Sequence, residues 1–360
     1  MKKVIVCFVM AAIVSAGVAA CSKPDTSGGN STEKAVVAET QGETETKAGA
    51  TEQGGERDLL LPPEGYPEKN IEFVVPAAAG ATLDLLTRGL NDSGLDLGKP
   101  LAITNMAGAS QTLGLAEVAS RKADGYTLTC SGAAGTLVQP LLLDLSYSME
   151  DFRYISMLNA PVPNSVAVAA DSQYQTWDDI AEALKAGETL HYTSANTGSV
   201  GHMAALELMS QMNAESAVYV SYNGAAEATA ALLSGDVEFF INDVDLVMER
   251  VKEGQFRCLL TLDKERSPFA PEVPAAAEYG MVGLESFMGM TWIMIDAETP
   301  DDIVAYVKQQ LDLAVGSEAF AGFLKSLNKE PTPVVSEQEL TDMLYQAREA
   351  YRQVVEKMNQ

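Results

Sequence analysis

Small residues stand between an expected strand and an expected helix at four places in this chain. A helix N-terminus carries unpaired N–H groups and a partial positive charge, and Gly or Ala there lets a ligand approach the backbone. Gathered at the carboxyl ends of strands, such loops can bind an anion without any Lys or Arg. For each loop alone, ordinary helix capping by Thr82, Ser199 or Asn223 is the alternative. The four loops are Gly80-Ala81-Thr82, Gly135-Thr136, Asn196-Thr197-Gly198-Ser199 and Asn223-Gly224-Ala225.

Few side chains are spaced for catalysis. Ser199 and His202 lie on neighbouring turns, so a secreted serine hydrolase is an alternative, but there is no G-x-S-x-G motif and nothing nominates an orienting carboxylate. Asp243 and Asp245 resemble paired carboxylates, yet they lack a nearby basic or nucleophilic partner. With 2 His and 4 Cys, a His-rich metal site is hard to build. We expect no catalytic residues, no cofactor and no metal.

Two further polar residues have alternative roles. Asp84 lies just inside a helix start, where the helix dipole favours a carboxylate whatever the function. It could instead bond an amino or hydroxyl group of a ligand, directly or through water. His202, near the start of another helix, either orients its loop, bonds the ligand, or is satisfied by local backbone.

The expected elements alternate short apolar runs with helical patterns, which indicates an α/β fold with mixed, mostly parallel sheets flanked by helices. The expected strands are 71–75, 101–104, 126–130, 166–170, 191–194, 218–221, 237–241, 257–261 and 292–295. The first expected helix begins at Leu83 and ends near Gly94 or Gly98. The other expected helices cover 113–119, 177–186, 202–212, 225–234, 300–315, 318–327 and 337–358.

The charge balance limits the partners. The chain has 360 residues, with 24 basic and 50 acidic side chains and a formal net charge of −26. Attraction to a phosphate backbone would work against this field, so nucleic acid is not an expected partner. Its 47% hydrophobic residues suffice for one large or two ordinary domains.

The N-terminus indicates export. Residues 1–21 combine Lys2 and Lys3, an apolar run too short to span a bilayer, and small residues before Cys21. This pattern resembles a bacterial lipobox, which predicts a lipid on Cys21 and attachment to the cell membrane, at the cell surface or in the periplasm. An ordinary signal peptide with an incidental Cys21 is the alternative.

Residues 22–65 are acidic and poor in large apolar residues, as in a disordered tether. Within the folded part, Cys130 and Cys258 are predicted to be free thiols rather than a disulfide.

From Tyr66 onward the chain resembles the substrate-binding proteins of tripartite tricarboxylate transporters, also called the Bug family. The matching pieces are short, and their order and spacing together make the resemblance. They are Tyr66-Pro67-Glu68-Lys69-Asn70-Ile71, Val75-Pro76 with Gly80 and Asp84, Gly108-Ala109, Asp124-Gly125-Tyr126-Thr127-Leu128, Tyr192 with Ser194, Gly198-Ser199 with His202, Tyr222-Asn223-Gly224, Leu233-Ser234-Gly235-Asp236-Val237, Arg266-Ser267-Pro268, Pro271-Glu272-Val273-Pro274 and Glu278-Tyr279-Gly280.

The resemblance implies a two-domain clamshell of the periplasmic-binding-protein kind, with 66–165 and 287–360 in one domain and 166–286 in the other. It also implies capture of a small organic di- or tricarboxylate in the cleft and delivery to membrane permease subunits, by a protein that we expect to be a monomer. A sensory or scaffolding lipoprotein of the same fold is the alternative. The ligand-binding residues carried over from the family are Ala78, Ala79, Gly80, Ala81, Thr82, Asp84, Gly135, Thr136, Ser194, Asn196, Thr197, Gly198, Ser199, His202, Asn223, Asn242 and Asp243.

One departure from the family pattern concerns the first loop. The family usually has paired Gly and a Pro before the residue at Asp84, whereas this chain has Ala79-Gly80-Ala81. A methyl group there restricts φ and fills space, so ligand size or pose is expected to differ. The expected mechanism is binding of the anion by backbone N–H groups of the Gly80 and Gly135 loops, followed by closure of the Thr197–Ser199 loop and Asn223 onto it.

Overall fold

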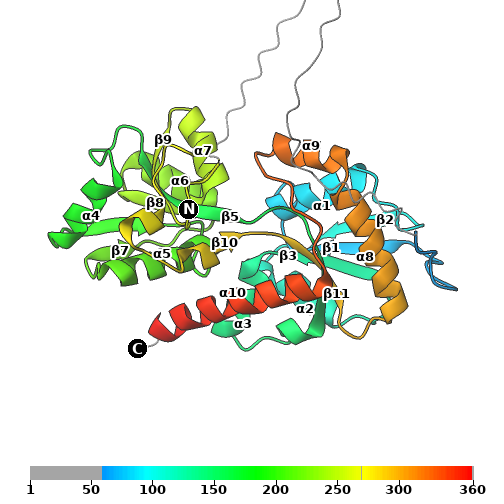
Figure 1. Cartoon of the computed structure of the whole chain (residues 1–360). Coiled ribbons are helices and arrows are strands. Elements are labelled where there is room, and N and C mark those ends of the chain that lie inside the picture. The colour runs from blue at the N-terminus through cyan, green and yellow to red at the C-terminus, as the bar shows by residue number, and fades with distance from the viewer. Residues whose placement is uncertain (1–58, 269, 359–360) are drawn as a thin grey trace, which may run out of the picture. The chain divides into compact units, whose positions relative to one another are not determined.

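The computed structural model describes residues 59–268 and 270–358, which contain two β-sheets flanked by helices (Figure 1). The predicted signal peptide at 1–21, Cys21 and the predicted tether up to residue 58 lie outside the described residues. In the described part of the chain, no helix is both long and apolar enough to cross a membrane.

The first lobe is built on a five-stranded sheet with the order β2-β1-β3-β11-β4. Its strands are β1 (Ile71–Val75), β2 (Leu101–Asn105), β3 (Thr127–Ser131), β4 (Phe152–Met157) and β11 (Trp292–Asp296). Its helices are α1 (Thr82–Asp92), α2 (Thr112–Ala119), α3 (Gln139–Leu142), α8 (Asp301–Val315) and α9 (Glu318–Ser326), with the short helical segments η1 (Ala109–Gln111), η2 (Ala134–Val138) and η3 (Met149–Asp151).

The second lobe is built on a six-stranded sheet with the order β10-β5-β8-β6-β7, in which β9 also pairs with β5. Its strands are β5 (Val162–Ala169), β6 (Leu190–Thr193), β7 (Ala217–Tyr219), β8 (Phe239–Asp243), β9 (Phe256–Thr261) and β10 (Met288–Gly289). Its helices are α4 (Trp177–Lys185), α5 (Val200–Met212), α6 (Ala225–Ser234) and α7 (Val244–Lys252), with the short η4 (Ala276–Tyr279) and η5 (Leu284–Ser286).

The central strands of each sheet are buried on both faces and are largely apolar, whereas the edge strands β2 and β7 are partly exposed. In β1, Phe73 packs in one core cluster with α1, α8 and α9, while the next residue, Val74, packs in another with α2. In β8, Phe239 and Phe240 likewise face opposite clusters. This alternation follows from the two-residue repeat of a strand.

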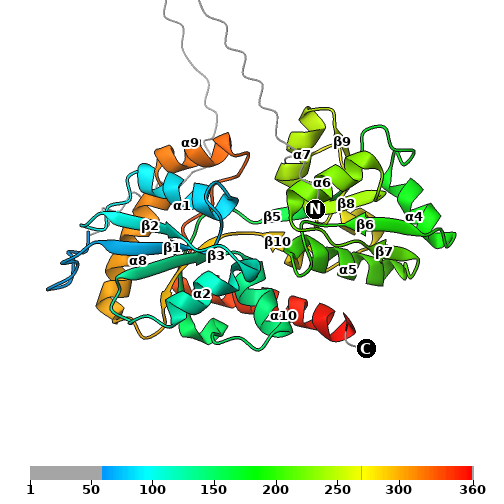
Figure 2. The ribbon, with the colours of Figure 1, turned by 180° about the vertical axis from the view of Figure 1, so that it is seen from behind.

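The long C-terminal helix α10 (Glu337–Met358) contacts both lobes (Figure 1, Figure 2). It packs against β4 and η2 of the first lobe and against α5 of the second. Its Tyr351 ring meets the Phe287 ring edge to face, with centroids 5.1 Å apart, and its Lys357 pairs with Glu207 of α5 at 2.7 Å. The core is therefore continuous between the lobes on this side.

The predicted predominance of parallel pairing is wrong. Four strand pairs are parallel and five are antiparallel among the described strands. The antiparallel pairs all involve β5 or β11, the strands that begin where the chain has just crossed from one sheet to the other. A strand that arrives from the other sheet has no preceding crossover helix to impose parallel pairing. The predicted free thiols are confirmed, because Cys130 and Cys258 lie in different sheets and form no disulfide.

Candidate functional site

A cavity of about 240 Å³ is lined by residues of both lobes and of the segments that join them. The first lobe provides the starts of α1 and η2 and one side chain of η1, and the second provides the start of α5 and the end of β8. The lining residues are Thr82, Leu83, Gln111, Gly132, Ala133, Ala134, Asn159, Ala195, Ser199, Val200, Gly201, Asn242, Asp243, Gly289, Met290, Thr291 and Lys329.

At the start of α1, the loop uses two of its own N–H groups internally. The Gly80 N–H donates to Asp84 Oδ2 at 2.8 Å, and the Ala81 N–H donates to the Ala78 carbonyl at 3.1 Å. Gly80 has φ +82°, so a side chain there would strain the backbone. The N–H groups left without an intrahelical partner belong to the first turn, where Thr82 and Leu83 line the cavity.

Asp84 holds this loop in place. Its side chain is 2% exposed and accepts hydrogen bonds from Arg88 Nε at 2.9 Å and Asn105 Nδ2 at 2.8 Å, besides the Gly80 N–H. Burial alone would raise the pKa of Asp84, but the bonds from Arg88, Gly80 and Asn105 outweigh it and lower the pKa. The carboxylate thus joins α1 to β2, and Asp84 is not among the cavity-lining residues.

Gln111 enters the cavity from an unusual turn. Ala109, Ser110 and Gln111 all have positive φ, at 45°, 52° and 80°, a conformation that non-glycine residues rarely adopt. The Gln111 side-chain oxygen accepts from Ser131 Oγ at 2.8 Å and from the Gly132 N–H at 3.1 Å. With its oxygen fixed by these donors, the Gln111 amide nitrogen remains as a donor at the cavity.

The start of α5 is fixed by a reciprocal pair of bonds. Ser199 Oγ accepts from the His202 N–H at 3.1 Å and caps the helix, while His202 Nδ1 accepts from the Gly198 N–H at 3.1 Å. His202 is 3% exposed, and its ring lies 4.1 Å from the Tyr219 ring. The two side chains therefore shape the loop, and the first-turn N–H groups of Val200 and Gly201 lie at the cavity.

This arrangement gives stability a dependence on pH. Burial lowers the pKa of His202 from its ordinary 6.5 to about 4, so between these values the unfolded chain binds a proton that the folded protein does not. The contribution of His202 to the free energy of unfolding should therefore fall as pH falls, by about 3 kcal/mol between pH 6.5 and 4, while the raised pKa of Asp243 acts in the opposite direction. Urea denaturation at both ends of this range isolates the His202 contribution: relative to the wild type, His202→Asn should gain about 3 kcal/mol as pH falls, whereas His191→Gln should follow the wild type. An unchanged slope in His202→Asn would contradict the assignment.

The cavity floor carries the charged groups. Lys329 Nζ lies 2.6 Å from Asp245 Oδ2, and the two side chains are only 11% and 7% exposed. Asp243, two residues before Asp245, lines the cavity with Lys329. Burial and the nearby Asp245 carboxylate raise the pKa of Asp243, and Lys329 opposes them only in part. A side chain at Gly289 would clash, because its Cβ would come 2.5 Å from Asp243 Oδ2.

Among the predicted site residues, Thr82, Ser199, Asn242 and Asp243 line the cavity. Asn223 is exposed and donates to Glu227, and Thr136 is buried with its hydroxyl donating to the Gly132 carbonyl. The structure also brings in residues that the sequence analysis missed. The predicted residues outside the lining are Ala78, Ala79, Gly80, Ala81, Asp84, Gly135, Thr136, Ser194, Asn196, Thr197, Gly198, His202 and Asn223; the missed polar ones are Gln111, Asn159, Thr291 and Lys329.

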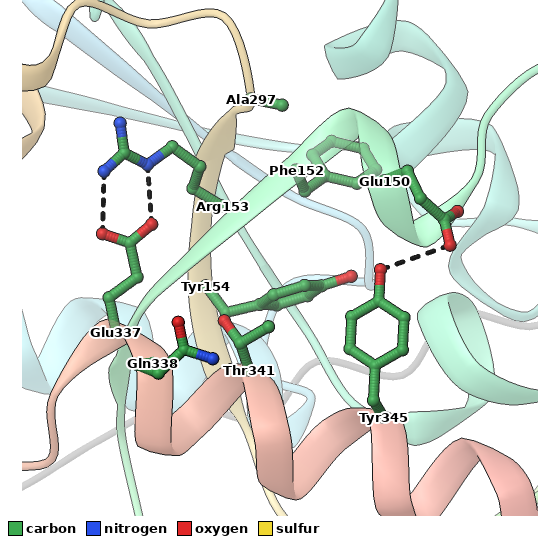
Figure 3. Close-up of a pocket in the computed structure, with 9 residues that line it drawn as sticks. All are labelled: Glu150, Phe152, Arg153, Tyr154, Ala297, Glu337, Gln338, Thr341 and Tyr345. Carbon is green, nitrogen blue, oxygen red and sulfur yellow. Dashed lines mark hydrogen bonds and ion pairs between the residues drawn. The ribbon is translucent and has the colours of Figure 1, made fainter.

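A larger hollow, of about 610 Å³, lies between β4 and α10 (Figure 3). Its charged groups are already paired, since Arg153 makes two bonds to Glu337, at 2.6 and 2.9 Å, and Tyr345 donates to Glu150 at 3.2 Å. None of the predicted site residues lines it. The smaller cavity, which gathers helix starts and charged groups, is therefore the candidate site. Within 59–268 and 270–358 there is no group of three or more His, Cys, Asp or Glu placed to hold a metal ion.

The chain has relatives of known sequence and structure. Protein BugT of Bordetella pertussis is 30% identical over 266 residues, which cover 71% of this chain and 78% of BugT. MatC of Rhodopseudomonas palustris, solved with bound malate, superimposes with a TM-score of 0.67 at 24% identity, over 81% of this chain and 100% of MatC. An R. palustris protein solved with adipate gives a TM-score of 0.69 at 23% identity, over 81% and 97%.

These likenesses confirm the predicted α/β clamshell fold of the periplasmic-binding-protein kind. The sequence pattern of the TctC family, described as the tripartite tricarboxylate transporter family receptor, matches residues 88–360. That match covers most of the chain and confirms the resemblance predicted from the short motifs. The chain belongs to the tripartite tricarboxylate transporter receptor family.

Proposed function

We propose that this protein is an extracytoplasmic solute receptor that captures a small organic acid in the cavity between its lobes and delivers it to the permease subunits of a tripartite tricarboxylate transporter. The observation that carries the proposal is the meeting of two helix starts, those of α1 and α5, with Lys329 at one cavity of about 240 Å³. First-turn N–H groups and an amine are the donors that a carboxylate needs.

The relatives support the same ligand class. MatC was solved with malate and the R. palustris protein with adipate, and both are small dicarboxylates. In this proposal the residues that contact the acid are Thr82 and Leu83 on α1, Val200 and Gly201 on α5, and Lys329. Asp84, Ser199 and His202 position these groups through the bonds described above.

The two lobes correspond to two domains in this proposal. The chain passes between the sheets within 158–161 and again within 290–291, a few residues from the predicted boundaries at 165/166 and 286/287. Opening and closing about these short segments would admit and enclose the acid.

Residues 1–21 are proposed as a lipoprotein signal peptide and Cys21 as the lipid-bearing residue, with 22–65 as the tether. Partition of the protein into detergent, lost in Cys21→Ser, tests the anchor.

The binding experiment is a thermal-shift screen of the purified protein against di- and tricarboxylates, amino acids, aromatic acids and neutral controls. An acid at about 100 times its Kd should stabilise the folded protein by roughly 2.7 kcal/mol, which raises the melting temperature. Ala195→Trp, which fills the cavity, should abolish the shift, whereas Thr197→Trp, at an exposed position of the same loop outside the lining, should retain it. No shift with any acid, or equal shifts in both variants, would contradict the proposed site.

A further inference from the structure

Three strained residues in a row lie beside the cavity. Ala109, Ser110 and Gln111 have φ of 45°, 52° and 80°, a range in which a side chain crowds its own backbone. Glycine adopts such angles freely, yet the chain places glycine at none of the three positions. Residues persist in such conformations only where the surrounding structure holds them, and they concentrate at ligand-binding sites. The strain therefore points to a side chain with a role that glycine cannot perform.

Gln111 is the one of the three whose side chain lines the cavity. The orientation of its amide is fixed, because the Gly132 N–H can only donate and therefore meets the oxygen, Oε1, at 3.1 Å. Ser131 Oγ donates to the same oxygen at 2.8 Å. The amide nitrogen, Nε2, makes no hydrogen bond among the described residues. It is therefore available to donate to a group that enters the cavity.

The same side chain also fills space next to η2. A Cβ atom at Gly135 would lie 2.9 Å from Gln111 Cβ and 2.8 Å from Oε1, so Gln111 already occupies the room that a side chain at Gly135 would need. A Cβ atom at Gly132, which lines the cavity, would lie 3.7 Å from Nε2. Gln111 is thus packed against both glycines, and its removal would enlarge the cavity where it meets the end of β3 and the start of η2.

We propose that Gln111 is the specificity-determining residue of the cavity. Its amide nitrogen donates to the anionic solute, and the bulk of its side chain limits the length of the acid that fits. The strained turn is the means by which a side chain reaches a position whose backbone suits glycine. This inference rests on the proposed function and adds to it the residue that selects among acids.

Calorimetric titration with succinate, glutarate, adipate and pimelate tests the inference. Gln111→Glu keeps the size of the side chain and the oxygen that accepts from Ser131 and Gly132, but it replaces the donor with a negatively charged acceptor. It should weaken binding of the acid that the wild type prefers by at least about tenfold. A residue that only braced the turn would leave binding unchanged in this variant, because the contacts of the oxygen remain.

Gln111→Gly tests the limit on length. Glycine suits a φ of 80°, so this variant relaxes the backbone while it removes both the donor and the bulk of the side chain. The affinity for pimelate relative to succinate should rise by at least about tenfold over the wild-type ratio. Ser110→Gly is the matched control, because it relieves the strain at a φ of 52° without changing the cavity lining, and it should bind as the wild type does.

Three results with folded variants would overturn the inference while the proposed function stands. Wild-type affinity in Gln111→Glu would show that the amide nitrogen does not contact the solute, and a wild-type ratio in Gln111→Gly would show that the side chain does not set the length. A loss of binding in Ser110→Gly equal to that in Gln111→Gly would assign the effect to the conformation of the turn.

Two further outcomes are also decisive. If Gln111→Gly shows no cooperative thermal transition, Gln111→Asn takes its place, because asparagine is shorter and tolerates positive φ. If the wild type binds none of these dicarboxylates, the inference is wrong, and the broader screen of acids decides separately whether the proposed function stands.

Discussion

Replacing Lys329 with Met should lower the free energy of unfolding by about 3–5 kcal/mol. The amine is the partner of Asp245 at 2.6 Å, and both side chains are almost fully buried, so the substitution leaves a carboxylate without its cation. Asp243 stands close by, where burial and the Asp245 carboxylate raise its pKa and favour its neutral form. The ion pair also links α7 to the segment after α9, so its loss loosens a contact between the lobes. Urea denaturation at neutral pH measures the change.

A double-variant cycle separates the charge from the packing. Removal of both charges in Lys329→Met with Asp245→Asn should recover most of the lost stability, because no unpaired buried ion remains. Lys325→Met, at an exposed position of α9, is the matched control and should change stability by less than about 0.5 kcal/mol. A single Lys329→Met variant as stable as the wild type would show that the pair contributes nothing to the fold.

Replacing Asp84 with Ala should cost about 2–4 kcal/mol of folding stability. The substitution removes the shared acceptor of Arg88, Asn105 and the Gly80 N–H, and it takes a carboxylate away from the start of α1. Arg88 is 45% exposed and can be solvated, so most of the loss comes from the other two donors. Chemical denaturation gives the size of the effect, and Asp84→Asn should fall between the wild type and Asp84→Ala.

The same variant tests whether Asp84 positions the loop or contacts the solute. Asp92→Ala, at the exposed end of the same helix, serves as the control and should be nearly neutral. Because Asp84 does not line the cavity, Asp84→Asn should weaken acid binding only indirectly, to the extent that the altered bond to the Gly80 N–H displaces the Gly80 loop. A complete loss of binding with full stability would instead make Asp84 a direct ligand contact.

Local sequence patterns determined most of the elements. β1 at 71–75, α6 at 225–234 and α10 at 337–358 have the predicted bounds, because an apolar repeat and its end signals act within one element. The Ser199 cap of α5 was also predictable from the small-residue loop before it. The short motifs along the chain were sufficient to predict the family, and with it the clamshell fold.

Only the tertiary structure decided which groups meet at the cavity. Lys329 is 84 positions from Asp245, so no local pattern could pair them. In the loop at 78–81, the Gly80 N–H donates to Asp84 and is therefore not available to a ligand. Gln111 reaches the site through a run of positive φ angles at Ala109 to Gln111, a backbone that its residue types do not favour. The sequence pattern of β11 likewise did not predict that this strand runs antiparallel to β3 and β4. Helix starts and strands follow from neighbours in sequence, whereas the pairing of buried charges depends on which distant segments exclude water together.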